Sequence, residues 1–122
     1  MKLDPQVVDH LPLSEVAFEI ILALAGGERH GYAIMSDVAE RTNGRVKLHP
    51  GTLYRALNRM LTGGLVEEID ERPVPELDDE RRRYYKLTPL GRRVASAAAV
   101  RMADQVAAAR SKRLVSSREL AP

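Results

Sequence analysis

The sequence contains no cysteine, no tryptophan and only one phenylalanine. The lack of cysteine excludes a disulfide scaffold, a thiolate metal site and a cysteine nucleophile. The first residues, MKLDPQVVDHLPLSEV, include prolines and acids and lack the apolar core of a signal peptide. The longest apolar stretch, IILALAGG, is too short to span a bilayer. We therefore expect a cytoplasmic protein with no membrane association.

Catalytic and metal-binding patterns are missing as well. The only histidines are His10, His30 and His49, and none of them pair at HxH or HxxxH spacing, so we expect no metal site. There is no evident nucleophile–base–acid set or paired-carboxylate pocket. The stretch GGERHG follows a predicted helix rather than a strand, so it is not a nucleotide-binding fingerprint. We therefore expect neither an enzyme nor a bound cofactor.

What the sequence does contain is typical of a small globular protein. Its 122 residues are 44% hydrophobic and 30% charged, which predicts one ordered domain with a limited core. Association with a second copy would bury more apolar surface. The formal net charge is +2 and the sequence pI is about 9.1, which mildly favours a nucleic-acid partner.

Apolar residues recur at helical spacing in the first half of the chain. Residues 1–11 lack this pattern, and we expect a flexible N-terminal arm there. LPLSEVAFEIILALAGG predicts a helix that starts near Ser14 and ends at Gly26–Gly27. HGYAIMSDVAERTNG predicts a second helix that ends at Asn43–Gly44.

A third helix is predicted to follow a short strand. RVKL, at residues 45–48, alternates polar and apolar side chains, which is enough for a strand. Pro50 suits the first position of a helix, where its missing N–H costs nothing, and Gly63–Gly64 suits the end. The expected inner stripe of this helix is Leu53, Leu57, Met60 and Leu61.

The remaining chain predicts a β-hairpin and one long helix. Two strand-like runs, LVEEID and RRYYKL, flank the Pro- and acid-rich segment ERPVPELDD. Thr88 suits the N-cap of the last helix and Pro89 its first turn, and Ala-rich sequence without a breaker continues to about Leu114.

This order of elements predicts a mainly α fold with a small β-hairpin. Three short helices and a two-stranded hairpin form the winged helix-turn-helix, whose third helix enters the major groove of DNA. The hairpin, or wing, reaches the neighbouring backbone. We assign this domain to residues 12–87, a C-terminal dimerisation helix to residues 88–115, and a frayed tail to residues 116–122.

The third predicted helix has an outer face without carboxylates. From Arg41 to Arg59 the sequence carries five basic residues and no acid. Residues three and four apart share a helix face, so Thr52 lies with Arg55 and Arg59, and Asn58 lies beside them. Arginine pairs with guanine edges or phosphate, and asparagine suits adenine. We interpret this face as reading DNA; the alternative is a solvated surface.

Residues around this helix are candidates for contacts to the DNA backbone. Lys47 and His49 precede it, and the backbone N–H groups near Gly51 lack intrahelical partners, which favours bound phosphate. Tyr54 and Tyr32 have two interpretations. Each is either a packing residue or a donor of its hydroxyl group to phosphate.

The second strand of the hairpin is also basic. The wing residues expected to contact DNA are Arg82, Arg83 and Lys86. Alternation along the strand indicates that Tyr85 and Leu87 face the core, which leaves basic side chains to bind phosphate. In the alternative interpretation, the arginines pair with the acids directly before them, which are Asp78, Asp79 and Glu80.

The last helix carries a broad stripe of small and apolar side chains. These residues are Ala95, Ala98, Ala99, Met102, Val106 and Ala109. Three short helices cannot cover so long a stripe, so we expect a second copy of the chain to pack against it. The alternative is packing against the first predicted helix of the same chain.

Four motifs in order resemble the PadR family of bacterial transcriptional regulators. They lie in LALAGGERHGYAIMSDV, KLHPGTLYRALNRMLTGGLVEE and RRRYYKLTPLGRR, and they cover roughly residues 13–93. The resemblance implies a winged-helix repressor that dimerises through its C-terminal helix, binds a palindromic operator and releases it when a small effector binds. The residues that match the family pattern by position are Tyr32, Gly51, Thr52, Tyr54, Arg59 and Arg83.

The chain departs from the family pattern at three places. Arg55 replaces a frequent proline, and His49 stands where Ser or Thr often caps the helix. The predicted wing tip is richer in proline and acids than the usual Gly-rich turn. Some compact members of the family bind flat aromatic drugs between tryptophans, and the absence of tryptophan here means that this mode cannot be transferred.

We therefore expect a sequence-specific, DNA-binding transcriptional regulator. Its expected partners are double-stranded DNA, a second copy of the chain and a small effector of unknown identity. The alternative function is a winged-helix module for protein–protein contact, with an acid-rich wing tip as its binding element.

Overall fold

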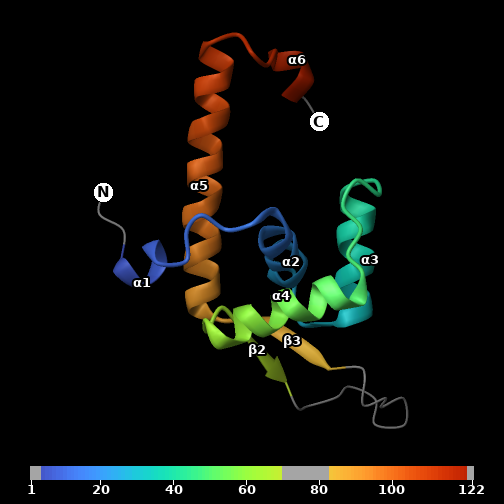
Figure 1. Ribbon diagram of the computed structural model, residues 1–122. Helices are drawn as coiled ribbons and strands as arrows, with labels where there is room; N and C mark the ends of the chain where they lie inside the picture. The colour runs from blue at the N-terminus through green and yellow to red at the C-terminus, as the bar shows by residue number, and fades with distance from the viewer. Residues whose placement is uncertain (1–3, 70–82, 121–122) are drawn as a thin grey trace.

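The computed structural model describes residues 4–69 and 83–120. These residues form a mainly helical structure with a small antiparallel sheet at one end (Figure 1). The elements in chain order are α1 (Pro5–Val8), α2 (Glu15–Ala25), β1 (Arg29–His30), α3 (Gly31–Arg41), α4 (Pro50–Thr62), β2 (Val66–Ile69), β3 (Tyr84–Leu87), α5 (Pro89–Ser111) and α6 (Ser117–Leu120).

The ends of the helices follow local sequence signals. The Ser14 hydroxyl accepts a hydrogen bond from Ala17 N at 3.0 Å and so caps α2. Helices α3 and α4 each end in a Schellman motif, in which the residue after the cap has a positive φ. That residue is Asn43, at φ 52°, after α3 and Gly64, at φ 77°, after α4. The predicted ends of both helices are therefore confirmed.

Helix α2 contributes most of the centre of the core. Ile20, Ile21 and Leu24 are at most 1% exposed, and α3, α4 and α5 pack around them. Helix α4 buries Leu53 and Leu57 completely, together with Ala56 and Met60, as its predicted inner stripe requires. Leu61, predicted for the same stripe, is only half-buried.

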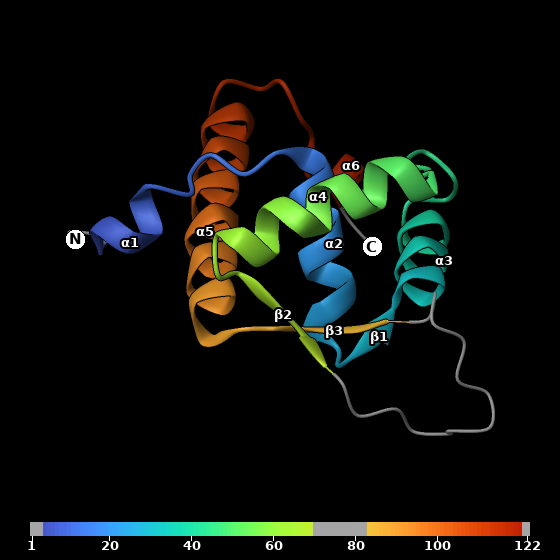
Figure 2. The ribbon, with the colours of Figure 1, turned by 60° about the horizontal axis from the view of Figure 1, so that its bottom comes forward.

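The sheet has the strand order β1–β3–β2 and is antiparallel throughout. Figure 2 shows α4 crossing over the bundle above the sheet. In the β2–β3 pair, Val66 lies opposite Leu87 and Glu67 lies opposite Lys86. The predicted hairpin is confirmed as far as these strands; its tip lies outside the described residues.

The strand predicted at residues 45–48 is wrong, because this segment is a loop. The Thr42 hydroxyl accepts a hydrogen bond from Val46 N at 3.1 Å and donates to Val38 O at 2.8 Å, which folds the segment back on the end of α3. Leu48 is 8% exposed and joins the core. The third strand is instead β1, which pairs with β3.

Both predicted loose ends contain helical turns. In the N-terminal arm, Asp4 accepts a hydrogen bond from Gln6 N at 2.9 Å and caps α1, whose Val7 is 4% exposed. In the C-terminal tail, Ser116 and Glu119 form a reciprocal capping box at α6, with hydrogen bonds of 3.1 and 3.2 Å. Residues 5–8 and 117–120 therefore form short helical turns within the predicted flexible arm and frayed tail.

Helix α5 begins where the sequence predicts, with Thr88 as its N-cap. Its first half lies beside α2, and its second half extends past the other elements (Figure 1). Within the described segments, no helix combines the length and apolar character needed to cross a membrane.

Candidate nucleic-acid interface

Helix α4 presents one polar face to solvent along its whole length. The exposed residues of this face, which we call the α4 face, are Gly51, Arg55, Asn58, Arg59 and Thr62. Thr52 and Tyr54 are half-buried at its two margins. Because the opposite side of the helix is locked into the core, this face cannot turn inward without breaking the fold.

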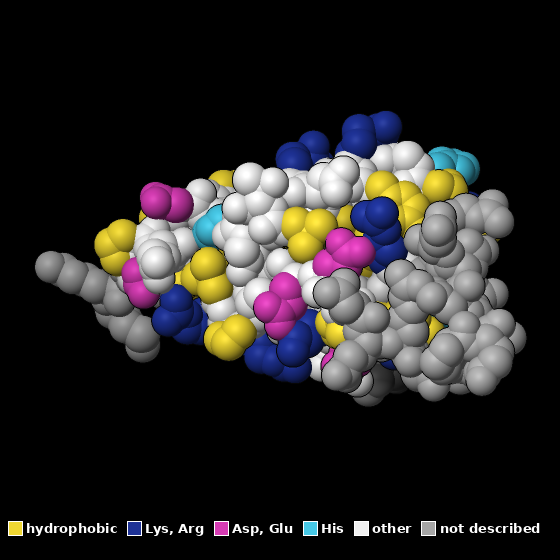
Figure 3. Space-filling model, turned by 90° about the horizontal axis from the view of Figure 1, so that it is seen from below, with side chains coloured by type: hydrophobic (Ala, Val, Ile, Leu, Met, Phe, Trp, Pro, Cys, Tyr) yellow, Lys and Arg dark blue, Asp and Glu magenta, His cyan; other side chains and the backbone are white. Residues whose placement is uncertain are grey.

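The α4 face is basic and carries no carboxylate. Within the described residues, neither Arg55 nor Arg59 forms an ion pair. Gly51 leaves room for Arg55, whose Nη1 would lie 3.3 Å from a Cβ at that position. Seen from below the sheet, Lys and Arg side chains stand out along the upper edge of the molecule, away from the acidic side chains nearer the centre (Figure 3).

The basic run does not extend upstream as the sequence suggested. Arg41 pairs with Glu19 at 2.7 Å and with Asp37 at 2.9 Å, and it donates to Glu19 O at 3.0 Å. Arg45 pairs with Glu15 at 2.8 Å. Burial alone would lower the pKa of Arg41, but its hydrogen bonds to Glu19 and Asp37 outweigh this and raise it. Only the part of the run from Lys47 to Arg59 remains unpaired with described acids.

The N-terminus of α4 is open to a ligand. His49 occupies the N-cap position, but its side chain makes no capping hydrogen bond, whereas the side chains of Ser14, His30 and Thr88 cap their helices. The first N–H groups of α4 are therefore not covered by the cap residue, and their partial positive charge faces outward. Lys47, in the preceding loop, is exposed.

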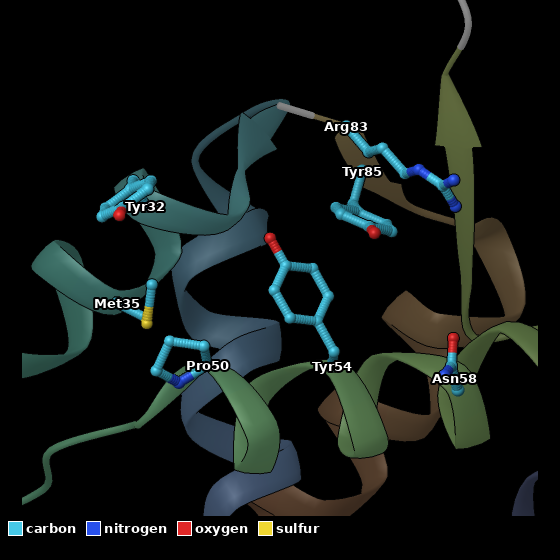
Figure 4. Close-up of a pocket in the computed structure, with 7 residues that line it drawn as sticks. All are labelled: Tyr32, Met35, Pro50, Tyr54, Asn58, Arg83 and Tyr85. Atoms are coloured by element: carbon cyan, nitrogen blue, oxygen red, sulfur yellow. The ribbon is translucent and has the colours of Figure 1, made fainter. Parts of the chain in front are cut away.

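A pocket of about 420 Å³ lies between α3, α4 and β3 (Figure 4). Its lining residues are Tyr32, Met35, Pro50, Tyr54, Asn58, Arg83 and Tyr85. Tyr54 reaches across to the start of α3, where its hydroxyl would lie 2.5 Å from a Cβ at Gly31. Tyr54 thus packs against its own chain and also lines the pocket, whereas Tyr32 is 68% exposed.

Tyr85 forms the inner wall of this pocket and is 3% exposed. Burial raises the pKa of its hydroxyl, and the nearby Glu68 carboxylate raises it further. The hydroxyl therefore stays protonated near neutral pH and is available as a hydrogen-bond donor. Its inward position agrees with the alternation predicted for this strand; Leu87 is half-buried.

The basic residues of the wing are paired with carboxylates on the neighbouring strand. Lys86 Nζ lies 3.0 Å from Glu67 Oε1, and Arg83 Nε lies 3.5 Å from Glu68 Oε1. These pairs are solvent-exposed, so each contributes only about 0–1 kcal/mol and can be exchanged for another anion. Arg82, and the acids at 78–80 that we considered as its partners, lie outside the described residues.

The predicted dimerisation stripe divides into two parts. Ala98 is 4% exposed within its own chain and Ala95 is half-buried, so both pack at least partly within their own chain. Ala99, Met102 and Val106 are exposed, the last two at 41% each, and Ala109 is half-exposed. Within residues 4–69 and 83–120, no group of three His, Cys, Asp or Glu could hold a metal ion.

Residues 20–97 match the model of the PadR-like family of transcriptional regulators. That match covers more than half of the chain. The chain belongs to the PadR-like family. An uncharacterized 37.1 kDa protein of transposon TN4556 from Streptomyces fradiae is 40% identical over 73 residues, which are 60% of this chain and 19% of that protein. This chain therefore spans about a fifth of that relative's length.

Solved structures share the winged-helix fold of this PadR-like chain. A transcriptional regulator from Clostridium thermocellum superposes with a TM-score of 0.66 at 20% identity, over 94% of this chain and all of the other. A PadR family regulator from Clostridium difficile gives 0.66 at 23% identity, over 80% of this chain and 97% of the other. RosR from H. salinarum gives 0.58 at 24% identity, over 91% and 86%. At these identities the likeness establishes the fold.

Sequence reasoning missed two features of this PadR-like surface. Met35 and Pro50 line the pocket, although the sequence predicted only that Met35 lies within the second helix and that Pro50 starts the third. The pairing of the basic wing residues Arg83 and Lys86 with Glu68 and Glu67 was also missed. The alternating side chains of LVEEID and RRYYKL could have indicated these pairs, but only if the register of the two strands had been known.

Proposed function

We propose that this chain is a DNA-binding transcriptional repressor that acts as a homodimer on a palindromic operator and is released by a small effector. The observation that carries the proposal is the α4 face, which is rigid, exposed and basic, with Arg55 and Arg59 free of ion pairs among the described residues. Membership of a family of transcriptional regulators supports it. Such a regulator would work in the cytoplasm, where it meets its DNA.

In this proposal the α4 face enters the major groove. Arg55, Asn58 and Arg59 contact base edges, because their exposed side chains are the longest polar groups on the face. Thr52 and the open N–H groups near Gly51 bind a phosphate, with Lys47 and His49 beside it. These contacts combine backbone positioning with base readout, which is what specific recognition requires.

The wing contributes contacts to the neighbouring DNA backbone. A DNA strand that runs from α4 to the wing would cross the pocket. Asn58 lies on one side of this pocket and Arg83 on the other (Figure 4). The hydroxyl groups of Tyr32, Tyr54 and Tyr85 are further donors in this pocket. Arg83 and Lys86 exchange their exposed carboxylate partners for phosphate, which limits the gain from each contact.

Dimerisation would place two α4 faces on one side of the DNA. The exposed half of α5 supports this, because Ala99, Met102, Val106 and Ala109 repeat at spacings of three and four. A two-fold dimer would match a palindromic site. An effector can release DNA only if it binds one dimer geometry more tightly than the other.

The decisive test is selection of fragments bound by the protein from the region upstream of its own gene, followed by fluorescence anisotropy on the selected site. We expect Arg55→Ala and Arg59→Ala each to weaken binding by about 1–3 kcal/mol. We expect affinity to fall steeply between about 50 and 200 mM salt. Arg45→Ala is the matched control, because it removes the same charge from an arginine paired with Glu15.

If Arg55→Ala and Arg59→Ala both protect the selected site as the wild type does, the α4 face does not read DNA. Tight binding to another protein with little dependence on salt, and no selected DNA, would instead favour the protein-contact module. Dimerisation has its own test by sedimentation. Met102→Glu should give monomers, whereas Ala108→Glu, an exposed site on another side of α5, should leave the dimer intact.

A further inference from the structure

A single threonine at the start of α5 forms hydrogen bonds with the turn that directly follows α4. Thr88 Oγ1 donates a hydrogen bond to Gly64 O at 2.6 Å and also lies 3.1 Å from Leu65 O. Thr88 N donates to Leu65 O at 3.0 Å. The same hydroxyl accepts a hydrogen bond from Gly91 N at 3.0 Å and so caps α5. One side chain thus joins two elements as well as capping a helix.

The carbonyls that Thr88 binds are themselves fixed to the last turn of α4. Gly64 N donates to Leu61 O at 3.1 Å, and Leu65 N donates to Met60 O at 2.9 Å. These are the two hydrogen bonds of the Schellman motif. Any displacement of α5 at Thr88 is therefore passed directly to the final turn of the helix that carries the α4 face.

Close packing removes the remaining freedom at this junction. A Cβ at Gly91 would collide with Leu65 O and would lie 2.7 Å from Leu87 Cδ1, so only glycine lets α5 approach this closely. Leu65 is 4% exposed and Gly91 is buried. The hydrogen bond from Thr88 to Gly64 O is exposed, whereas the contact with Leu65 O and the bond from Gly91 N are partly buried. The partly buried contacts are the more costly to break, because the freed groups stay unsatisfied.

We propose that Thr88 is a positioning residue for DNA reading, which holds α4 and the first half of α5 as one rigid body. The inference rests on the proposed function, because the angle between these helices matters only if α4 reads DNA. Its consequence is that the spacing of the two α4 faces in a dimer is set by how the exposed halves of α5 pack. The spacing of the α4 faces does not depend on bending between α4 and α5, because these helices move together.

The test separates capping from positioning at the same residue. Thr88→Asp keeps an acceptor for Gly91 N, since aspartate is a good N-cap, but a carboxylate cannot donate to Gly64 O or Leu65 O. Thr88→Ser restores the hydroxyl. Ser14→Asp is the matched control, because Ser14 caps α2 and accepts its hydrogen bond from Ala17 N of that same helix. If Thr88→Asp does not fold, Thr88→Val removes the donor without adding charge but also removes the cap acceptor. Ser14→Val, which removes only a helix cap, is then its control.

The first readout requires no DNA. The chain lacks cysteine, so spin labels attach only at Asn58→Cys and Arg101→Cys, two exposed sites on α4 and α5. Excess unlabelled chain restricts the measurement to distances within one protomer. We expect a narrow distance distribution for the unsubstituted, Thr88→Ser and Ser14→Asp proteins, and a broad one for Thr88→Asp and Thr88→Val.

The second readout measures the DNA affinity of the unlabelled proteins. The selected sites are altered so that the two half-sites lie one base pair closer together or further apart. We expect the wild type to lose affinity by about tenfold, the scale of one poorly matched position, and Thr88→Asp to lose much less. A narrow distribution with unchanged spacing preference in Thr88→Asp would overturn the positioning role. If the distribution broadens but even the wild type binds no DNA, the proposed function fails while the rigid junction stands.

Discussion

Two pairs of arginines in this chain have the same spacing but different surroundings. Arg41 and Arg45 lie four residues apart, as do Arg55 and Arg59. The first pair is held by Glu15, Glu19 and Asp37, at distances from 2.7 to 3.8 Å. The second pair has no ionic partner among the described residues. The charge of an arginine is therefore most available to a ligand where the fold leaves it unpaired.

The difference arises from which neighbours the fold supplies. The end of α3 packs beside the start of α2, which carries Glu15 and Glu19, so the two arginines there meet acids that are distant in sequence. Helix α4 has no acid of its own, and no described acid reaches Arg55 or Arg59. The first pair thus contributes to stability and the second to the proposed function.

The largest expected effect comes from giving Arg55 the partner that Arg41 has. Gly51→Asp reproduces the four-residue spacing of Asp37 and Arg41, and the only close contact of a Cβ there is the flexible Arg55 side chain. We expect DNA affinity to fall by about 2–3 kcal/mol, the upper range for one reading contact, as measured by anisotropy. Gly51→Ala controls for the added Cβ. Full affinity in Gly51→Asp would mean that Arg55 does not contact DNA.

A smaller effect is expected from removing the acid that holds the first pair. The Glu19 side chain is 12% exposed and accepts a hydrogen bond from Arg41 at 2.7 Å. Glu19→Gln should lower the free energy of unfolding by about 1–2 kcal/mol, because it weakens a charged hydrogen bond in a partly buried site. Urea denaturation measures this. DNA affinity should not change, and an increase would show that freed Arg41 or Arg45 can also bind DNA.

The smallest effect is expected at the exposed pair. Arg45 and Glu15 side chains are 63% and 62% exposed, so Glu15→Gln should lower stability by less than about 0.5 kcal/mol. The same denaturation series carried out in about 1 M salt should remove the difference from wild type. A loss as large as that of Glu19→Gln would show that exposure does not control the strength of these ion pairs.

Much of the fold could be predicted because its signals are local. Caps at Ser14 and Thr88, the turn signals at Asn43–Gly44 and Gly63–Gly64, and the apolar stripe of α4 all depend on residues within one turn of each other. The errors fell where local pattern and tertiary context compete. RVKL alternates like a strand, but Thr42 and the burial of Leu48 hold it as a loop, and β1 was missed because two residues carry no periodicity.

The candidate site was less predictable than the fold. The sequence placed Arg55, Asn58 and Arg59 together on an exposed face, as the structure has them. The sequence could not reveal that acids of α2 pair with Arg41 and Arg45, or that Ala98 is buried. Nor could it reveal that the Tyr54 hydroxyl packs against Gly31. Each of these depends on a contact between residues far apart in the chain.

The sequence by itself determined where helices begin and end, which side of α4 is apolar, and that this helix carries no acid, because each property depends on neighbours three or four positions away. Only the tertiary structure decided which arginines remain unpaired, how far α5 is covered by its own chain, and how Thr88 ties α5 to α4. Those outcomes depend on distances between elements, and ionic and hydrogen-bond energies fall steeply with distance.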